Sequence, residues 1–220
     1  MRPDCDQILN NLVLRLPTLA SIQHQIAQAA EMLIDTYNRG GKVLICGNGG
    51  SAADSEHIAG ELLKGFMLRR PLPDQLRRDI TSRLAERGQK LADDVLPRLQ
   101  MGLPAVSLVS QVAVGSAIAN DLGADLVYAQ QTLALGRPGD LLIGLSTSGN
   151  ALNVVQAIRL AGGLAIKTLA MTGSSGGLLE QAADLCLKMP ADSTPLVQEL
   201  HLPVYHALCE IIEQYFYGET

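Results

Sequence analysis

Three hydroxyl side chains in a row could hold a phosphate group in the second half of the chain. Ser146, Thr147 and Ser148 are followed by Gly149 and Asn150, between the apolar run DLLIGL and an amphipathic segment. Hydroxyls donate to phosphate oxygens, glycine lets the backbone approach an anion, and a helix N-terminus offers unpaired N–H groups. The alternative is N-capping of the next helix by Ser148 or Asn150. A cap needs one hydroxyl, so three favour a phosphate site.

A second polar loop, CGNGGSAAD, leads into a helix that carries a histidine and a glutamate. Ser51 could cap that helix, with Asp54 three residues later as in a capping box. His57 and Glu61 are four residues apart and therefore lie on one helix face. The pair could be two metal ligands, a base and its neighbour, or a solvated surface pair. Spacing alone leaves these alternatives open.

Polar side chains are also concentrated in the C-terminal segment VQELHLPVYHALCEIIEQY. Gln198, His201, Tyr205 and His206 stand at the start of an otherwise apolar helix. His201, Tyr205 and His206 cannot all point the same way, so at least one of them is structural. His206 precedes apolar residues, so a buried core histidine is the alternative to a site residue. His24 lies in a polar stretch and is expected at the surface.

Alternating strands and helices must position these residues. Helical patterns separate short apolar runs that are typical of buried strands. The expected strands are KVLICG (42–47), PAVSLV (104–109), DLLIGL (140–145), AIKTLAM (165–171) and DLCLKM (184–189). This alternation predicts a three-layer α/β/α sandwich with a five-stranded parallel sheet. Ligands bind such sheets beyond the carboxyl ends of the strands, where both polar loops should lie.

Helical segments flank and interrupt this pattern. Residues 5–38 have helical periodicity, with a break expected at Pro17 and an end at Gly40-Gly41. Residues 69–100 are charge-rich and helical, without a strand. They predict a solvated surface helix, and the alternative is a lid or an oligomer contact near the preceding loop.

Composition excludes several classes of function. The chain of 220 residues is 47% hydrophobic and 18% charged, which predicts one globular domain, with two small domains as the alternative. A net charge of −5 and two phenylalanines without tryptophan argue against nucleic acid or an anionic membrane as a partner. The four cysteines form no CxxC motif, and neither a signal peptide nor a membrane span is recognisable. We therefore expect a cytoplasmic protein.

Together these motifs resemble a known family. The segments CGNGGSAADSEHIAGEL, AIANDLGAD, GDLLIGLSTSGNALNVVQA, TGSSGG and VQELHLPVYH resemble the sugar isomerase (SIS) domain, and within it the phosphoheptose isomerases. The resemblance covers 5–66 and 101–217. It implies a flavodoxin-like SIS domain spanning 1–220, with N-terminal helices and a helical insert at about 67–101. It also implies an aldose–ketose isomerase that interconverts sedoheptulose 7-phosphate and D-glycero-D-manno-heptose 7-phosphate.

The resemblance also implies roles for single residues. The implied phosphate loop is Ser146, Thr147 and Ser148. The other implied substrate-binding residues are Asn48, Gly49, Gly50, Ser51, Asn120, Asp121 and Gln198. The implied zinc ligands are His57, Glu61, Gln198 and His206. Glu61 and His206 are also the implied acid–base pair, which suits an enediol mechanism in which a carboxylate moves the carbon-bound proton and a histidine the hydroxyl proton. Family members of this type are homotetramers.

Three features depart from the family pattern. Ala151 replaces a serine, Pro203 stands between Gln198 and His206, and the insert is absent from short phosphoheptose isomerases.

A non-catalytic SIS adaptor that assists replication initiation through protein contacts is the rival prediction. The presence of both Glu61 and His206 favours the enzyme. A sugar-phosphate-sensing regulator is a third alternative, but no DNA-binding segment is recognisable.

Overall fold

The computed structural model describes residues 3–218 and contains a five-stranded, all-parallel sheet. Its strands are β1 (Val43–Gly47), β2 (Ala105–Ser107), β3 (Leu141–Leu145), β4 (Lys167–Thr172) and β5 (Leu185–Lys188). They run in the order β2-β1-β3-β4-β5. β1 and β3 are fully buried and pair in register from Val43↔Leu141 to Gly47↔Leu145. The predicted sheet is confirmed, with no strand end shifted by more than two residues.

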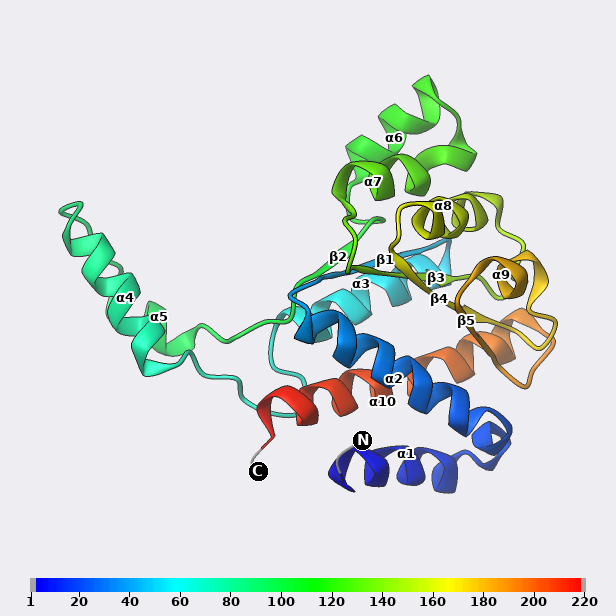
Figure 1. The fold of residues 1–220 in the computed structure, drawn as a ribbon, viewed down its shortest axis with the longest axis horizontal. Coiled ribbons are helices and arrows are strands. Elements are labelled where there is room, and N and C mark those ends of the chain that lie inside the picture. Colours follow the sequence, from blue (N-terminus) through cyan, green and yellow to red (C-terminus); the bar gives the residue numbers. More distant parts are fainter. Residues whose placement is uncertain (1–2, 219–220) are drawn as a thin grey trace.

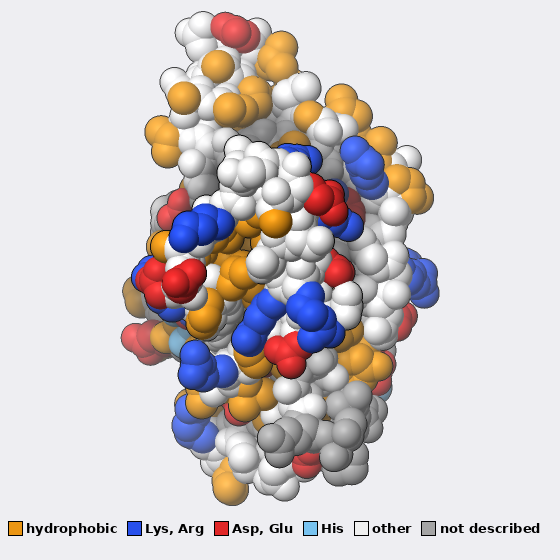
Figure 2. All heavy atoms as spheres, turned by 90° about the vertical axis from the view of Figure 1, so that its left-hand side faces the viewer, with side chains coloured by type: hydrophobic (Ala, Val, Ile, Leu, Met, Phe, Trp, Pro, Cys, Tyr) orange, Lys and Arg blue, Asp and Glu red, His pale blue; other side chains and the backbone are white. Residues whose placement is uncertain are grey.

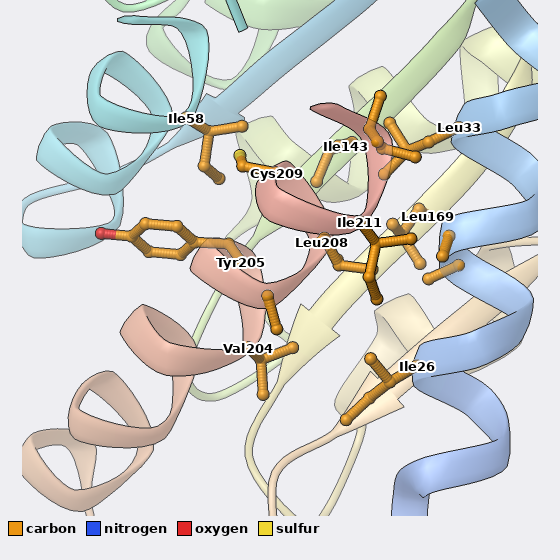
Figure 3. Packing of buried hydrophobic residues seen from close by; sticks show 14 of the residues in the cluster. Ile26, Leu33, Ile58, Ile143, Leu169, Val204, Tyr205, Leu208, Cys209 and Ile211 are labelled. Carbon is orange, nitrogen blue, oxygen red and sulfur yellow. The ribbon is translucent and has the colours of Figure 1, made fainter. Parts of the chain in front are cut away.

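Helices cover both faces of the sheet, which confirms the three-layer architecture (Figure 1). One face is covered by α2 (Gln23–Asn38), α3 (Gly50–Leu63) and α10 (Thr194–Tyr217), and the other by α7 (Val127–Leu135), α8 (Leu152–Gly163) and α9 (Gly177–Ala182). Between α10, α2 and the sheet, Ile211 and Leu208 pack near Leu33 and Leu169 (Figure 3). Burial of these aliphatic side chains is the main source of stability.

The N-terminal region forms two α-helices, as predicted. α1 (Pro3–Arg15) packs on α10, and the 3₁₀-helix η1 (Pro17–Ile22) separates it from α2. The break falls at Pro17, which stands at the start of η1 because proline lacks the N–H that a continuous helix needs. α2 ends at Asn38, just before the two glycines.

The charge-rich segment projects from the domain as an arm, which we define as residues 71–100 (Figure 1). It contains α4 (Asp74–Ala85) and the short α5 (Val95–Arg98), and neither has a buried residue. An isolated antiparallel bridge between Pro71 and Gln100 closes its base. Viewed from the side of the arm, basic, acidic and hydrophobic side chains are interspersed (Figure 2).

The arm leaves the domain at the amino edge of the sheet. It follows α3, which begins beyond β1 and runs back along the sheet, and it leads into the first residue of β2. The loops after β1 and β3 lie at the opposite edge. The arm therefore does not cover these loops in its own chain. A lid near the end of α3 and an oligomer contact stay predictions.

Two remaining helices lie between β2 and α7. α6 (Val112–Asp121) is apolar in sequence but has no buried residue, and the 3₁₀-helix η2 (Ala124–Leu126) follows it. α9 was not predicted. Among the residues that the structure describes, no helix is long and apolar enough to cross a membrane.

Candidate active site

The two polar loops meet where the strand order reverses. The chain passes from β1 to β2 on one side and later to β3 on the other, so the carboxyl ends of β1 and β3 form a switch point, the usual ligand site of this architecture. Asn48 in the first loop and Asn153 at the start of α8 exchange two amide hydrogen bonds of 2.8 and 3.0 Å. The Tyr128 hydroxyl donates to Gly47 O at 2.5 Å. The loops are thus tied to each other.

The hydroxyl-rich loop keeps hydrogens available for a ligand. Ser146 Oγ accepts from Ala151 N at 3.4 Å, and Ser148 Oγ accepts from Asn150 N at 3.2 Å. Both hydroxyls act as acceptors in these bonds, so each still has a hydrogen to donate. Ala151 is the N-cap of α8 and provides no side-chain cap. The capping alternative for Ser148 and Asn150 is therefore wrong.

Gly149 gives this loop its shape. Its φ is +67°, and a Cβ there would lie 2.0 Å from Gly176 O, so only glycine fits. Asn150 Oδ1 accepts from Leu178 N at 3.0 Å and ties the loop to α9. The hydroxyl loop is therefore held by a neighbouring loop that the sequence did not connect with it.

The first loop starts α3 without a side-chain cap. Gly49, with φ +56°, is the N-cap, and the helix begins at Gly50. Ser51 is therefore inside the helix, buried, and the predicted capping box with Asp54 is wrong. A Cβ on Gly50 would lie 2.3 Å from Gln198 Nε2, so the Gln198 amide covers the start of α3.

Asn120 and Asp121 are not brought to these loops. They end α6, where Asn120 Nδ2 donates to Asp121 Oδ1 at 2.8 Å, and both are exposed. α6 packs mainly on η2 and α7.

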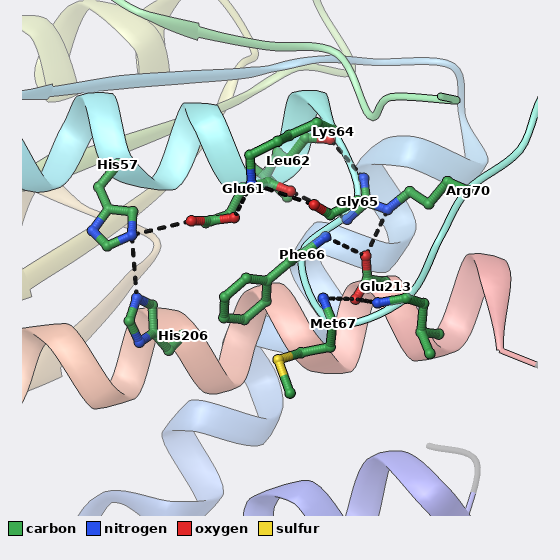
Figure 4. Close-up of polar contacts among 11 residues, drawn as sticks. His57, Glu61, Leu62, Lys64, Gly65, Phe66, Met67, Arg70, His206 and Glu213 are labelled. Carbon is green, nitrogen blue, oxygen red and sulfur yellow. Dashed lines mark hydrogen bonds and ion pairs between the residues drawn. The ribbon is translucent and has the colours of Figure 1, made fainter. Parts of the chain in front are cut away.

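A second cluster joins three of the predicted site residues (Figure 4). His57 Nε2 lies 3.2 Å from Glu61 Oε1 and 3.4 Å from His206 Nε2. His57 and Glu61 belong to α3, and His206 to the parallel neighbour α10. Pro203 stands inside α10, but the helix continues through it and His206 still reaches His57. The structure therefore places a carboxylate and an imidazole on either side of His57.

A chain of hydrogen bonds behind His57 orients its ring. The Tyr205 hydroxyl lies 3.1 Å from Asp54 Oδ1 and 3.0 Å from His57 Nδ1. If the hydroxyl donates to the carboxylate, Nδ1–H must donate to the hydroxyl, and Nε2 then presents a lone pair to Glu61 and His206. His57 Nε2, Glu61 Oε1 and His206 Nε2 are electron-rich atoms that face one another, so they need a proton or a cation between them. Burial raises the pKa of Asp54, although Tyr205 and His57 oppose the shift.

The charges around Glu61 favour its ionised form. Burial alone would raise the pKa of Glu61, but the 2.7 Å hydrogen bond from Lys64, the Lys64 charge and His57 outweigh burial, so this pKa is lowered. Burial and the neighbouring His57 lower the pKa of His206, and Glu61 opposes them. At neutral pH the site thus offers a carboxylate base and a neutral imidazole, the pairing that general acid–base catalysis uses.

The donor set partly fits a tetrahedral metal ion. Zinc bonds of 2.0–2.1 Å give ligand–ligand edges of about 3.3 Å, close to the two distances around His57. However, no group of three or more His, Cys, Asp or Glu side chains within residues 3–218 has the arrangement of a metal site. Gln198, the fourth predicted ligand, lies against Gly50, seven residues before His57 on α3. Gln198 therefore lies at the start of α3 and not in the His57 cluster.

His201 is the structural histidine of α10. It is fully buried, and neither ring nitrogen has a hydrogen-bond partner in the described chain. Burial lowers its pKa from 6.5 to about 4, and the nearby Thr172 backbone opposes this shift. The ring is therefore neutral in the folded protein at pH 7.

This buried ring should make stability depend on pH. Unfolding frees a group of pKa 6.5 from a site where its pKa is about 4. The unfolded chain therefore binds more protons between these values, and stability falls as pH drops below 6.5, by about 3 kcal/mol at pH 4. We expect urea unfolding at pH 7 and pH 5 to give a smaller difference for His201→Leu than for wild type. An equal difference would contradict this.

Several functional neighbours were missed from the sequence. Tyr128 and Lys64 lie outside the family motifs, Asn153 lies within one without an assigned role, and Asp54 was assigned to a capping box with Ser51. The one usable signal was the spacing of Glu61 and Lys64, three residues apart on a helix, which places an acid and a base side by side.

The site residues fall into two groups along α3. Asn48, Gly50 and Gln198 lie at the sheet edge with the hydroxyl loop, whereas His57 and Glu61 follow seven and eleven residues into the helix. At 1.5 Å per residue, Glu61 is about 16 Å along the axis from the start of α3.

Comparisons with known proteins agree with this architecture. The SIS domain family matches residues 10–101 and 106–210. Phosphoheptose isomerases of Akkermansia muciniphila and Roseiflexus sp. are 38% and 37% identical, covering 91% and 97% of this chain and 90% and 93% of those proteins. The solved phosphoheptose isomerase from Francisella tularensis aligns with a TM-score of 0.74 at 32% identity, over 91% of both chains.

The phosphoheptose isomerase GmhA from Neisseria gonorrhoeae aligns with a TM-score of 0.69 at 31% identity, over 96% of this chain and 94% of that one. Family match, identity and fold agree along nearly the whole length. The chain belongs to the SIS domain family and, within it, to the phosphoheptose isomerases.

Proposed function

We propose that this protein interconverts sedoheptulose 7-phosphate and D-glycero-D-manno-heptose 7-phosphate. The observation that carries the proposal is the convergence of Glu61 and His206 on His57 from two parallel helices. The names of the relatives support a phosphorylated heptose as substrate. The adaptor alternative needs neither an acid–base pair nor its orienting Tyr205 and Asp54.

Each group has a part in the proposed reaction. The ionised Glu61 takes the proton from one carbon of the substrate and returns it to the adjacent carbon, through an enediol. His206, neutral near pH 7, moves the proton between the two oxygens. The hydroxyl loop, with the N-terminus of α8, binds the phosphate.

Zinc is the proposed metal. His57, Glu61 and His206 supply the nitrogen and oxygen donors that zinc prefers, and the Asp54–Tyr205 chain orients His57 as outer partners of metal ligands do. When bound, zinc would polarise the substrate carbonyl. Gln198 as a fourth ligand stays a prediction. Metal analysis of protein purified without chelator should give about one zinc per chain, and His57→Ala should lose it.

We further propose a homotetramer with sites at subunit interfaces. The unburied apolar helix α6, with Val112 79% exposed, supports self-association. The separation of the hydroxyl loop from Glu61, and the exposure of Asn120 and Asp121, support sites completed by a second copy. The thiols of Cys46, Cys186 and Cys209 form no disulfide among the described residues, which supports the reducing cytoplasm as its location.

The proposed function is tested by proton exchange. The protein is incubated in D₂O with a panel of phosphorylated ketoses, and NMR follows loss of the proton at the reacting carbons and appearance of the aldose. We expect exchange with sedoheptulose 7-phosphate to be the fastest. An adaptor would exchange none of the panel.

Ser148 provides a separate test of the phosphate loop. We expect Ser148→Ala to raise KM for the phosphorylated ketose roughly 10- to 100-fold, because a hydrogen bond to a charged group is worth about 1.5–3 kcal/mol. kcat should change little. Ser21→Ala is the matched control, because the exposed Ser21 hydroxyl donates to Thr18 O within its own turn. An unchanged KM, with equal use of dephosphorylated sedoheptulose, would remove the loop from phosphate binding.

A further inference from the structure

A buried ion pair joins the end of α3 to α10, beside the Glu61–His206 cluster (Figure 4). Arg70 Nε donates to Glu213 Oε1 at 2.8 Å, and the two residues are 1% and 0% exposed. Neither the family motifs nor the proposed mechanism uses this pair. Two fully buried opposite charges need a complete set of partners, and the surroundings supply one.

The Glu213 carboxylate is held by four donors. Besides Arg70, it accepts from the backbone N–H groups of Phe66, Met67 and Leu68 at 2.7, 2.6 and 2.8 Å. Three successive N–H groups around one anion form a backbone nest. The segment that leaves α3 is therefore wrapped around a side chain of α10.

Arg70 binds the last turn of α3 directly. Nη1 donates to Leu62 O at 2.8 Å and Nη2 to Glu61 O at 3.2 Å. These carbonyls are among those that a helix C-terminus leaves unpaired, and a cation is favourable there. The guanidinium also lies over the Tyr217 ring, 5.0 Å from its centroid. One side chain thus holds the backbone of Glu61 and contacts two residues of α10.

On α10, the spacing of Glu213 and His206 places both residues on the side of α3. Glu213 follows His206 by seven residues, about two helical turns, so both lie on the face that α3 contacts. From Arg70 and Glu213 the hydrogen bonds run without interruption to the backbone of Glu61 on one side and the helix of His206 on the other. We propose that Arg70 and Glu213 are positioning residues that fix the Glu61 carboxylate relative to the His206 imidazole.

Hydrophobic side chains could join the two helices as firmly, but they would not fix them in the same way. Replacing a buried ion pair by apolar residues of similar volume is often neutral or stabilising. Directional bonds to Glu61 O and to three consecutive amides instead define where the helix end lies. The kinetic part of this inference rests on the proposed isomerase activity. Its test therefore also needs a readout that does not depend on that activity.

The test compares Arg70→Lys with a stability control, Ile211→Val. Lysine keeps the charge but cannot make the forked bonds of arginine. Ile211 lies on the opposite side of α10, near Leu33 and Leu169 (Figure 3). Two readouts are used below the melting transition of every variant: kcat and KM for the phosphorylated ketose, and ¹⁵N shifts of the labelled histidine rings.

For Arg70→Lys we expect kcat to fall roughly 10- to 100-fold with KM within twofold, because an ångström of misplacement can cost that much. The His57 and His206 ring shifts should move, while those of the remote His24 stay. Ile211→Val should change neither readout. If Arg70→Lys does not fold, Tyr217→Leu, which removes only the ring beside the guanidinium, is tested with the same expectations.

The outcomes separate the two proposals. Unmoved His57 and His206 shifts overturn the positioning role, whatever the activity. A kcat loss no larger than that of Ile211→Val, in an active wild type, overturns it as well. If the ring shifts move in Arg70→Lys but the wild type isomerises no ketose phosphate, the positioning role is supported and the proposed isomerase activity is rejected.

Discussion

Replacing Glu61 with glutamine is expected to lower kcat by roughly 10²- to 10⁴-fold, the usual contribution of a general base. Glutamine keeps the shape of the side chain but cannot take a proton from carbon. Solvent exchange of the substrate proton should be lost to the same extent, because the same group performs both steps. Binding of the sugar phosphate should persist, because the hydroxyl loop is joined to the start of α3, about 16 Å along the helix axis from Glu61.

The matched control is Glu86→Gln on the exposed arm, which should leave kcat unchanged. Exchange and turnover are measured by NMR in D₂O, and binding by calorimetry. If Glu61→Gln exchanged the substrate proton at the rate of wild type, another group would have to be the base. Loss of binding together with kcat would instead indicate that the carboxylate holds the substrate.

His206→Asn is expected to reduce kcat by a similar factor, roughly 10²- to 10⁴-fold, with little effect on the melting temperature. The ring is partly exposed and contacts His57 across the gap between α3 and α10, so its removal leaves no core cavity. A histidine buried in the core would behave in the opposite way and lower stability rather than turnover. Measuring both quantities on one variant separates these cases.

The exposed His24 supplies the control, since His24→Asn should change neither kcat nor melting temperature. Full turnover in His206→Asn would remove the imidazole from the mechanism and favour the adaptor. Bound zinc should be measured in parallel, because His206 is both a proposed ligand and a proposed acid–base group.

Most of the fold could be predicted because it depends on local pattern. Each strand is a short apolar run between turn residues, and strands that alternate with helices have few stable arrangements. Pro17 and the Gly40-Gly41 pair marked helix ends for reasons that need no tertiary information. The start of α3 was misplaced because Gly49 adopts a conformation that no capping rule describes.

The site was predictable where its residues share a helix and not where they meet across the chain. His57 and Glu61 are visible as a pair from spacing alone. Arg70 and Glu213 are 143 residues apart in sequence and meet only because α3 and α10 run side by side. Asn48 and Asn153 likewise meet because β1 and β3 are neighbours. A polar residue without a motif has no signal until its partner is known.

The bridge at the base of the arm bears on how the length of the arm affects the pairing of β1 with β2. β1 and β2 are neighbours, yet Val43 pairs with Ala105, and the arm lies within the intervening chain. If Pro71 and Gln100 meet first, the loop that must close is shortened by nearly half. The entropic cost of closing this loop then falls by only about 0.6 kcal/mol. The free energy needed to pair β1 with β2 therefore depends little on the length of the arm.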